Sequence, residues 1–364
     1  MILSKLQLQN FRNYQDIELK FNTDVNKIVL LANNATGKTN ILEAIYLLAL
    51  TKSFRVKKYQ DLILWGMDFA KVRGEVVKKD DTISVEVFID EMQKHQKIMK
   101  VNDVKVKTKQ FIGELNVVFF HPEDLNMLYL SPDLRRKYLD ILLSQTNKNY
   151  LQAFANYKKA IKQRNSLLNQ IFDREKSPSD LDVWDEKLVE NGQILIDERK
   201  KTVKFLNKYL EGIYRKISGG KEKLEIEYKT NVENEYLETL KKKREKDIRK
   251  GTTSVGPHRD DLRTHLNGRD VEEYGSRGEF RTILLALKIA EIRFIEEHTK
   301  ETPVLLLDDV FSELDPERQL RLLEAFNSCQ TIITTTDIVH LENVKEKIHI
   351  FELEDRRLVR DYVR

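Results

Sequence analysis

The sequence is poor in cysteine, proline and glycine, and these shortages exclude several classes of protein. Its 364 residues include one cysteine, Cys329, which cannot form a disulfide within the chain. Six prolines and 13 glycines leave no low-complexity tract and no obvious flexible linker. The apolar runs are far shorter than the roughly 18 residues that suggest a membrane span, and no secretory core is visible. We therefore expect a soluble, cytoplasmic protein with no membrane partner.

Neither sign of charge is in large excess. Lys and Arg number 63 against 59 Asp and Glu, so the formal net charge of +4 does not by itself indicate a nucleic-acid-binding protein. Any basic surface must therefore be local. The segment 241–250 carries seven Lys or Arg against two acids. It is either a phosphate-contacting surface or, in the interpretation that we favour, the solvated face of a helix.

Hydrophobic periodicity divides the chain into three parts. Residues 1–130 alternate mostly at period two, which predicts strands, with a helix at 40–50. Residues 131–255 follow a helical period and read as a helical insertion. Residues 256–364 return to strands around a helix at 280–297. Helices that alternate with apolar strands predict a mixed α/β layer fold, and a hydrophobic content of 40% is enough for a substantial core.

The segment 28–39 predicts a phosphate-binding loop. It runs from an apolar strand through a loop to a helix, which is the context that the P-loop pattern requires. Gly37 and a helix beginning near Lys38 would turn backbone N–H groups towards an anion. Lys38 would contact the β and γ phosphates of ATP, and Thr39 would offer its hydroxyl to Mg²⁺. The residues expected to line the nucleotide are Ala32, Asn33, Asn34, Ala35, Thr36, Gly37, Lys38, Thr39 and Asn40.

The pattern departs from the ideal at Ala32, which stands in the place of the first glycine. A methyl group narrows the allowed backbone angles, so we expect strain of about 1 kcal/mol there. An ordinary strand–helix turn is the alternative interpretation of the segment.

A second part of the same site is expected near the other end of the chain. The apolar run Val304–Leu307 ends in two carboxylates, which is the Walker B arrangement. Asp308 would reach Mg²⁺ directly or through water, and Asp309 would orient or deprotonate the attacking water. Most related ATPases carry Glu in place of Asp309, and the shorter side chain predicts slow hydrolysis. The alternative interpretation is that the two carboxylates cap a helix.

Several blocks of sequence, in order along nearly the whole chain, resemble the RecF family of bacterial DNA replication and repair proteins. The blocks are residues 10–14, 37–40, 120–125, 135–140, 256–262, 274–282 and 307–315. Any one block could mislead, but their combination is highly specific. The resemblance implies an ATPase head of the ABC type, related to SMC-like repair ATPases, with a mixed sheet around the P-loop helix and an inserted α-helical subdomain.

The resemblance also implies that Ser276-Arg-Gly-Glu279 is the signature motif of this head. In the family, the signature of one subunit meets the γ-phosphate held by the other, so that two ATP molecules join two heads and hydrolysis releases them. Ser276 and the N–H groups near Gly278 would therefore bind nucleotide within an ATP-dependent homodimer. The family usually has Gln at the positions of Arg277 and Glu279, so the charges here would alter that contact.

Further residues acquire roles only through the resemblance. Ser312–Asp315 would form the D-loop at the dimer interface, and Thr335–Asp337 would form the switch. Arg12 would contact the nucleotide, although packing or capping is an equal alternative for Arg12, Thr336 and Asp337. The expected Q-loop position holds His121, Glu123 and Asp124, which would link the metal site to the helical subdomain. For His258 and Arg259 we expect a structural turn first, and contact with nucleic acid or a partner second.

In function, the resemblance implies an ATP-dependent DNA-binding protein of recombinational repair, replication restart and the SOS response. It would recognise gapped DNA or single-strand/double-strand junctions, cooperate with RecR and RecO, promote RecA loading, and hydrolyse ATP weakly with stimulation by DNA. The DNA would be held through its phosphates with little sequence preference. The candidate contacts are Lys52, Arg55, Lys57, Lys58, Lys158, Lys159 and Lys162.

Three alternatives remain open. The chain could be the head of another SMC-like repair protein, which is disfavoured because hundreds of heptad residues are missing between the motifs. It could be a transporter ATPase, for which the signature and the lack of a clear Q-loop glutamine fit poorly. It could also be a nucleotide-gated DNA scaffold that never hydrolyses ATP.

Overall fold

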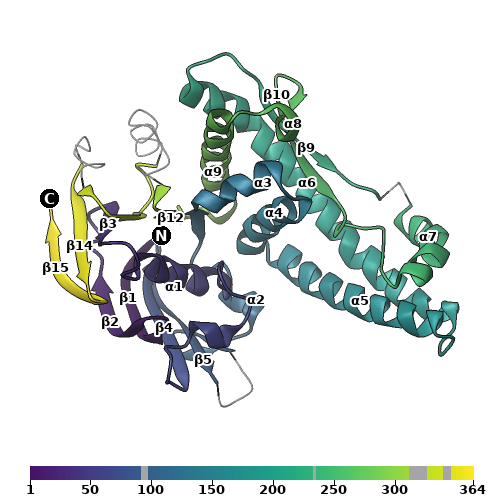
Figure 1. Cartoon of the computed structure of the whole chain (residues 1–364), viewed down its shortest axis with the longest axis horizontal. Helices are drawn as coiled ribbons and strands as arrows, with labels where there is room; N and C mark the ends of the chain where they lie inside the picture. The colour runs from purple at the N-terminus through teal and green to yellow at the C-terminus, as the bar shows by residue number, and fades with distance from the viewer. Residues whose placement is uncertain (92–96, 233–234, 311–325, 339–345) are drawn as a thin grey trace. The chain divides into compact units, whose positions relative to one another are not determined.

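The computed structural model describes residues 1–91, 97–232, 235–310, 326–338 and 346–364 of the chain, which divides into two compact units (Figure 1). Unit 1 comprises Met1–Asp124 and Leu284–Arg364, and unit 2 comprises Leu125–Ile283. The division expected at residues 255 and 256 differs from this one. Residues 256–283 fall in unit 2 because strand β10 (Asp261–Leu266) pairs along its length with β9 (Leu224–Lys229).

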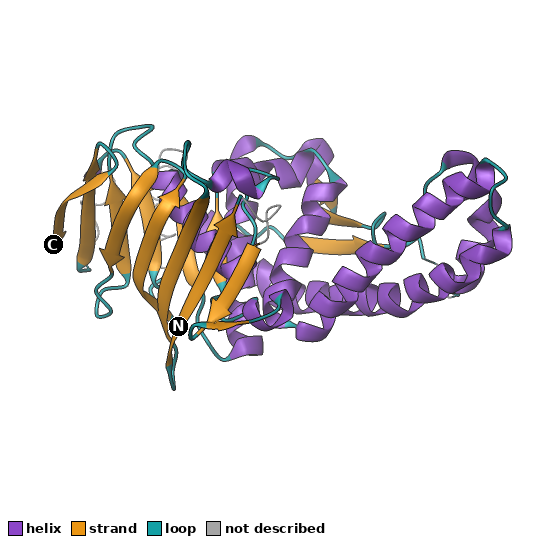
Figure 2. Ribbon diagram, turned by 90° about the horizontal axis from the view of Figure 1, so that it is seen from below, coloured by secondary structure: helices purple, strands orange, loops and turns teal. Residues whose placement is uncertain are grey.

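Unit 1 contains an antiparallel sheet with the strand order β2-β1-β4-β5-β6-β7, whose strands run side by side in Figure 2. The strands are β1 (Ile2–Phe11), β2 (Tyr14–Lys20), β4 (Phe69–Val77), β5 (Thr82–Asp90), β6 (Lys97–Val101) and β7 (Val104–Lys105). Asn102 and Asp103 form the turn between β6 and β7. Both residues have positive φ, 49° and 62°, as the tight turn of a hairpin requires.

A second sheet of unit 1 has the order β15-β14-β3-β13-β12-β8. Its strands are β3 (Lys27–Leu31), β8 (Val117–Phe120), β12 (Val304–Asp308), β13 (Thr331–Thr335), β14 (Ile348–Glu354) and β15 (Arg357–Val363). All the pairings are parallel except that of β15. The carboxyl ends of β3, β13 and β12 therefore meet at one edge of the sheet, and ligands bind at such edges in α/β folds.

Helix α1 (Lys38–Leu50) packs against strands of both sheets. Its residues from Ile41 to Leu50 are all buried, which explains why this segment is apolar on every side apart from Glu43. Gly37 and Thr51, at the two ends of the helix, both adopt the left-handed conformation. Among the described residues of this part of the chain, the other helices are η1 (Tyr59–Leu62), α2 (Thr108–Phe111) and η2 (Pro122–Leu125), and α9 (Arg277–Thr299) runs from unit 2 into unit 1.

Unit 2 is mainly helical, as the period of the sequence predicts. It contains α3 (Asn126–Tyr129), α4 (Pro132–Thr146), α5 (Lys148–Phe172), η3 (Pro178–Leu181), α6 (Asp182–Ser218), α7 (Tyr236–Lys250), α8 (Val271–Tyr274) and, in sheet order, β11 (Arg269–Asp270), β10 and β9. Side chains of Ser131 and Asn147 cap α4 and α5, and Gly219 ends α6 with φ 71°. The basic segment 241–250 is helical, and most of its Lys and Arg residues are exposed, as the favoured interpretation expects.

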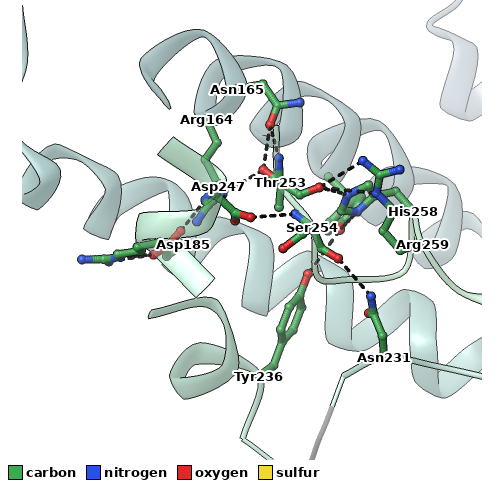
Figure 3. Close-up of polar contacts among 12 residues, drawn as sticks. Arg164, Asn165, Asp185, Asn231, Tyr236, Asp247, Thr253, Ser254, His258 and Arg259 are labelled. Carbon is green, nitrogen blue, oxygen red and sulfur yellow. Dashed lines mark hydrogen bonds and ion pairs between the residues drawn. The ribbon is translucent and has the colours of Figure 1, made fainter. Parts of the chain in front are cut away.

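A buried polar network joins α5, α6 and α7 (Figure 3). The guanidinium of Arg164 donates through Nε to Asp185 (2.6 Å) and through Nη1 to Asp247 (2.9 Å), and all three side chains are fully buried. The same Nη1 donates to the hydroxyl of Thr253, 2.9 Å away. A buried charge is stable only when it is paired and hydrogen-bonded, so these contacts fix how the three helices pack.

His258 and Arg259 belong to this network. A structural role is the first of the two that we expected for them. The His258 ring lies 2.7 Å from the Tyr157 hydroxyl and 3.0 Å from the Thr253 carbonyl oxygen, to which the Arg259 guanidinium also donates. Burial lowers the pKa of His258 to about 4, so the ring is neutral at pH 7.

In the residues that the structure describes, no helix is both long enough and apolar enough to cross a membrane.

Candidate nucleotide-binding site

The loop 32–37 connects β3 to α1 at the carboxyl edge of the parallel sheet. The N–H of Ala32 donates to the Thr335 carbonyl (3.3 Å), which extends the pairing of β3 with β13. The strain expected at Ala32 is wrong: the left-handed positions of the loop are Ala35, with φ 63°, and Gly37, with φ 113°. Ala32 directly follows the last residue of β3 and does not have a positive φ, so its methyl group meets no backbone restriction there.

Gly37 is required by its surroundings as well as by its φ. A Cβ atom at this position would lie 2.5 Å from Nδ2 of Asn13 and 2.8 Å from the Tyr14 hydroxyl. Asn13, in the turn between β1 and β2, donates to the Thr36 carbonyl (3.1 Å) and accepts from Asn40 (2.7 Å). The hairpin turn therefore holds the loop from outside. We did not assign Asn13 from the sequence, although it lies in the first RecF-like block.

The Lys38 side chain is buried and lies across the loop. Its ammonium group donates to the carbonyl oxygens of Ala32 and Asn33, the second at 2.9 Å. Burial lowers the pKa of Lys38, and the carboxylates of Asp309 and Asp308 act in the opposite direction. The loop thus holds a cation beside the open N-terminus of α1, which is the arrangement that binds a phosphate chain.

The structure brings Asp308 and Thr39 together across 269 residues of sequence. Asp308 Oδ1 accepts from the Thr39 hydroxyl (3.0 Å) and from the Thr334 hydroxyl (2.8 Å), and Oδ2 lies 3.5 Å from Nε2 of His121. The predicted proximity of these two site residues is confirmed. Thr334 was not predicted as a site residue. Its only signal in the sequence is a threonine run at the end of the strand that pairs with β12.

Asp309, the next residue, differs from Asp308 in exposure and in backbone conformation. Its φ is 50°, its side chain is exposed, and its backbone N–H donates to the Thr334 hydroxyl (2.9 Å). The two neighbouring carboxylates therefore occupy different environments, as different roles require.

The Thr39 hydroxyl and the Asp308 carboxylate are suited to Mg²⁺, a hard cation that prefers oxygen donors. Among the residues of known placement, no group of three or more His, Cys, Asp or Glu side chains could hold a metal ion by itself. In nucleotide sites, Mg²⁺ usually takes its remaining ligands from phosphate oxygens and water.

Arg12 is held by an ion pair with helix α1. Its guanidinium donates through Nε (2.7 Å) and Nη2 (2.8 Å) to the two carboxylate oxygens of Glu43, a fully buried residue of α1. Its Nη1 donates to the Asp61 carbonyl (2.7 Å). These contacts correspond to the packing alternative for Arg12, and its contact with a nucleotide stays a prediction. Glu43 was not anticipated, because nothing local in the sequence distinguishes a buried glutamate in an apolar helix.

A chain of polar contacts leads from Asp308 to α9. His121, next to Asp308, donates its backbone N–H to Asp124 (3.3 Å), and the Asp124 carboxylate lies 3.3 Å from Nζ of Lys288. Lys288 also pairs with Glu291 at 3.5 Å, and burial raises the pKa of Glu291 to about 7. All of these residues lie in unit 1, so the link to the helical subdomain that we expected from His121 and Asp124 stays a prediction. Glu123 contributes a backbone N–H to the His121 ring (3.1 Å).

Residues 276–279, the expected signature motif, lie in unit 2 and form a capping box at the start of α9. The Ser276 hydroxyl accepts from the Glu279 N–H (3.3 Å), and the Glu279 carboxylate accepts from the Ser276 N–H (2.7 Å). Ser276 is exposed and Gly278 is half-buried. Glu279 therefore has a local role that explains its presence without a triphosphate.

The two remaining expected segments are the D-loop and the switch, and the structure describes the second of them. Ser312–Asp315, the expected D-loop, lies outside the described residues. At the expected switch, the Thr335 hydroxyl donates to the Asp337 carbonyl (2.9 Å), which closes a local turn that includes Thr336.

Together, the parallel sheet, the loop around Lys38 and the paired Thr39 and Asp308 define a nucleotide-binding head of the ABC and SMC-like ATPase class. The profile of the RecF/RecN/SMC N terminal domain family matches residues 2–358. The chain is 40% identical to the DNA replication and repair protein RecF of Bacillus cytotoxicus, over 94% of each chain. It is 41% identical to that of Lachnoclostridium phytofermentans, over 94% of this chain and 95% of the other. The chain belongs to the RecF family.

Solved structures agree. The structure described as the recombination mediator protein RecF-ATP in the RecFOR pathway has a TM-score of 0.89 and 34% identity, and the match covers 99% of this chain and 97% of the other. An Smc head domain derived from Pyrococcus furiosus, bound to the C-terminal domain of ScpA, is 16% identical with a TM-score of 0.56, over 100% and 96% of the two chains. This second likeness shows the fold alone.

Proposed function

We propose that this protein is a cytoplasmic ATP-dependent DNA-binding protein of DNA replication and recombinational repair. In this proposal two copies close around ATP on gapped or junction DNA, and slow hydrolysis releases them. The observation that carries the proposal is the contact between Thr39 and Asp308 beside the buried Lys38, because it joins the two halves of an ATP site. The similarity to RecF proteins along nearly the whole chain supports the role in repair.

Each residue of the site has a separate task. The backbone N–H groups at the start of α1 and the Lys38 ammonium hold the phosphates. Thr39 and Asp308 would hold Mg²⁺, which supplies charge neutralisation to the phosphates when it is bound. Asp309, exposed at the end of β12, orients the attacking water and accepts its proton. His121, 3.5 Å from Asp308, limits the positions that this carboxylate can adopt.

The partner copy completes the site in this proposal. Ser276 and the N–H groups at the start of α9 form an exposed helix end that favours an anion. Presented to the γ-phosphate held by a second copy, this end would convert ATP binding into dimerisation, and loss of that phosphate would reverse it.

A sedimentation experiment tests the dimer. Ser276→Arg should retain ATP binding and remain monomeric with ATP, because a bulky side chain then occupies the surface that meets the partner's phosphate. Lys38→Met should fail to dimerise for a different reason, since it loses a phosphate-binding cation. Analytical ultracentrifugation with and without Mg²⁺-ATP, beside an ATP-binding assay, separates the two defects. ATP-dependent dimers of unchanged strength in Ser276→Arg would refute the role of the signature.

A substitution at Glu279 can change the charge at the start of α9 with little change in side-chain size. Glu279→Gln should strengthen ATP-dependent dimerisation by up to about tenfold at low salt, because the amide oxygen can keep the Ser276 N–H contact while one negative charge near the triphosphate is removed. The dimer dissociation constant at two salt concentrations gives the answer. Weaker dimerisation at both concentrations would show that the carboxylate assists the interface instead.

DNA would be held by phosphate contacts from exposed cations. The candidates are Lys52, Arg55, Lys57 and Lys58 in unit 1 and Lys158, Lys159 and Lys162 on α5 in unit 2, and all of these side chains are exposed. Such binding falls steeply with salt and shows little sequence preference. The partners would be RecR and RecO, with RecA loading as the outcome. Recovery of RecR from a mixture with ATP and gapped DNA tests the partnership.

Membership of the RecF family leaves one of the earlier alternatives open, a scaffold that binds ATP and never hydrolyses it. Phosphate release measured with and without gapped DNA distinguishes the two. Turnover that DNA stimulates supports the switch, and its complete absence supports the scaffold.

A further inference from the structure

Trp65 is 98% exposed, more than any other large apolar side chain of the described residues. It occupies the second position of a four-residue turn in which the Met67 N–H donates to the Leu64 carbonyl (3.0 Å). Gly66 has φ +84°, which the third position of a type II turn requires. A tryptophan that leaves its whole ring in water is unusual, because few side chains gain as much from burial.

The turn is ordered by the strand beneath it. The Leu64 N–H donates to the Asn10 carbonyl (2.8 Å), the Arg12 N–H donates to the Leu62 carbonyl (2.7 Å), and Phe11 forms a bridge with Ile63. These bonds attach the segment to the end of β1. Trp65 is therefore presented by backbone that is already fixed, so binding costs little further conformational entropy.

The chemistry of the same segment favours nucleic acid over a protein partner. Residues 52–58 expose Lys52, Arg55, Lys57 and Lys58. The rest of the segment 51–68 exposes two acids, Asp61 and Asp68, so the exposed charges of the segment keep a positive excess. The large apolar residue exposed beside Trp65 is Met67, at 38%. Aromatic anchors of protein interfaces are surrounded by other apolar contacts that exclude water. A lone aromatic ring in a cationic segment is instead typical of surfaces that bind single strands, where the ring stacks on a base and the cations contact phosphates.

We propose that Trp65 stacks on an unpaired base of gapped DNA, while the exposed cations of residues 52–58 contact the adjoining phosphates. The inference rests on the proposed function and adds to it the residue that distinguishes a gap from intact duplex. Bases within a duplex are already stacked on their neighbours and offer no free face to the indole. Every base has such a face once it is unpaired, so the contact tolerates any sequence.

The chain carries its own probe, because its tryptophans are Trp65 and Trp184. In a Trp184→Phe protein, Trp65 is the only tryptophan emitter. With ATP and at low salt, oligothymidylate and gapped duplex should quench its emission, and blunt duplex should not. In the unaltered background, Trp65→Ala should weaken binding of gapped DNA about tenfold and leave the affinity for blunt duplex unchanged. Trp65→Phe should retain most of the affinity, because it keeps an aromatic face.

The possible outcomes distinguish failure of the stacking proposal from failure of the proposed function. If gapped DNA binds by anisotropy but leaves Trp65 emission unchanged, the stacking proposal fails and the proposed function stands. If the unaltered protein binds no DNA, the proposed function itself fails and the stacking proposal falls with it. If Trp65→Ala binds gapped DNA normally but loses ATP-dependent dimers in the absence of DNA, the ring belongs to a protein interface and the proposal is overturned. The ring is fully exposed, so these substitutions should not impair folding.

Discussion

An Asp309→Asn variant should hydrolyse ATP at least about 100-fold more slowly than the unaltered protein and should still bind Mg²⁺-ATP. The carboxamide has nearly the same size, but it cannot accept the proton of the attacking water. The Thr39 hydroxyl bonds to Asp308, whereas the Asp309 side chain is exposed. Because phosphate binding is preserved, the ATP-dependent dimer should persist longer than in the unaltered protein. Single-turnover phosphate release and sedimentation of the same sample measure both effects.

The neighbouring substitution Asp308→Asn is the matched control, since it makes the same chemical change one residue earlier. It should lose turnover to a similar degree but for a different reason. The amide can still accept from the Thr39 and Thr334 hydroxyls, yet it lacks the charge that holds Mg²⁺. The Mg²⁺ concentration needed for ATP binding should therefore rise in Asp308→Asn alone. Equal Mg²⁺ dependence in both variants would contradict the separate roles, and normal turnover in Asp309→Asn would exclude Asp309 as the base.

The second large effect is expected on stability, in unit 2. Arg164→Ala should lower the free energy of unfolding by about 3–5 kcal/mol, because Asp247 and Asp185 are then buried without their central cation. Arg244 still donates to Asp185 at 2.6 Å and offsets part of the loss there, whereas the donor left to Asp247 among the described residues is neutral, the Ser254 N–H at 3.1 Å. The penalty should therefore fall mainly on Asp247.

Denaturant unfolding followed by Trp184 fluorescence, in a Trp65→Phe background, reports on α6 within this unit. Arg244→Ala is the control, since its side chain is 18% exposed and its loss leaves Arg164 bonded to Asp185. It should cost about 1 kcal/mol. A double variant, Arg164→Ala with Asp247→Asn, should recover part of the stability by removing the unpaired charge. If Arg164→Ala cost no more than Arg244→Ala, the network would not be the source of the packing specificity.

Some predictions from the sequence were wrong, and others were missing because they depend on contacts between distant residues. Strain was assigned to Ala32 because a motif has glycine there, but the backbone reverses at Ala35 and Gly37. The motif specifies residue types, but it does not specify which residue of the loop adopts a positive φ. Likewise, nothing near Glu43 or Lys288 in the sequence marks them as charged residues buried against partners 31 residues away (Arg12) and 164 residues away (Asp124).

The sequence alone determined whatever depends on neighbours along the chain. The strand, the phosphate loop and the helix of 28–50 follow from an apolar run, a glycine with positive φ and a helix-compatible apolar stretch. The helical period of unit 2 and the hairpin turn at Asn102 and Asp103 are equally local. These features form because backbone preferences and hydrophobic periodicity act over a few residues.

Only the tertiary structure decided which distant groups meet. Parallel pairing of β3, β13 and β12 brings Thr39, Thr334 and Asp308 to one sheet edge, and no local pattern specifies that strand order. The same holds for the attachment of 256–283 to unit 2 and for the turn that presents Trp65 on the end of β1. The physical reason is that strand order and burial are properties of the whole packed chain: hydrogen bonds and desolvation act between whatever surfaces folding brings into contact, irrespective of their separation in sequence.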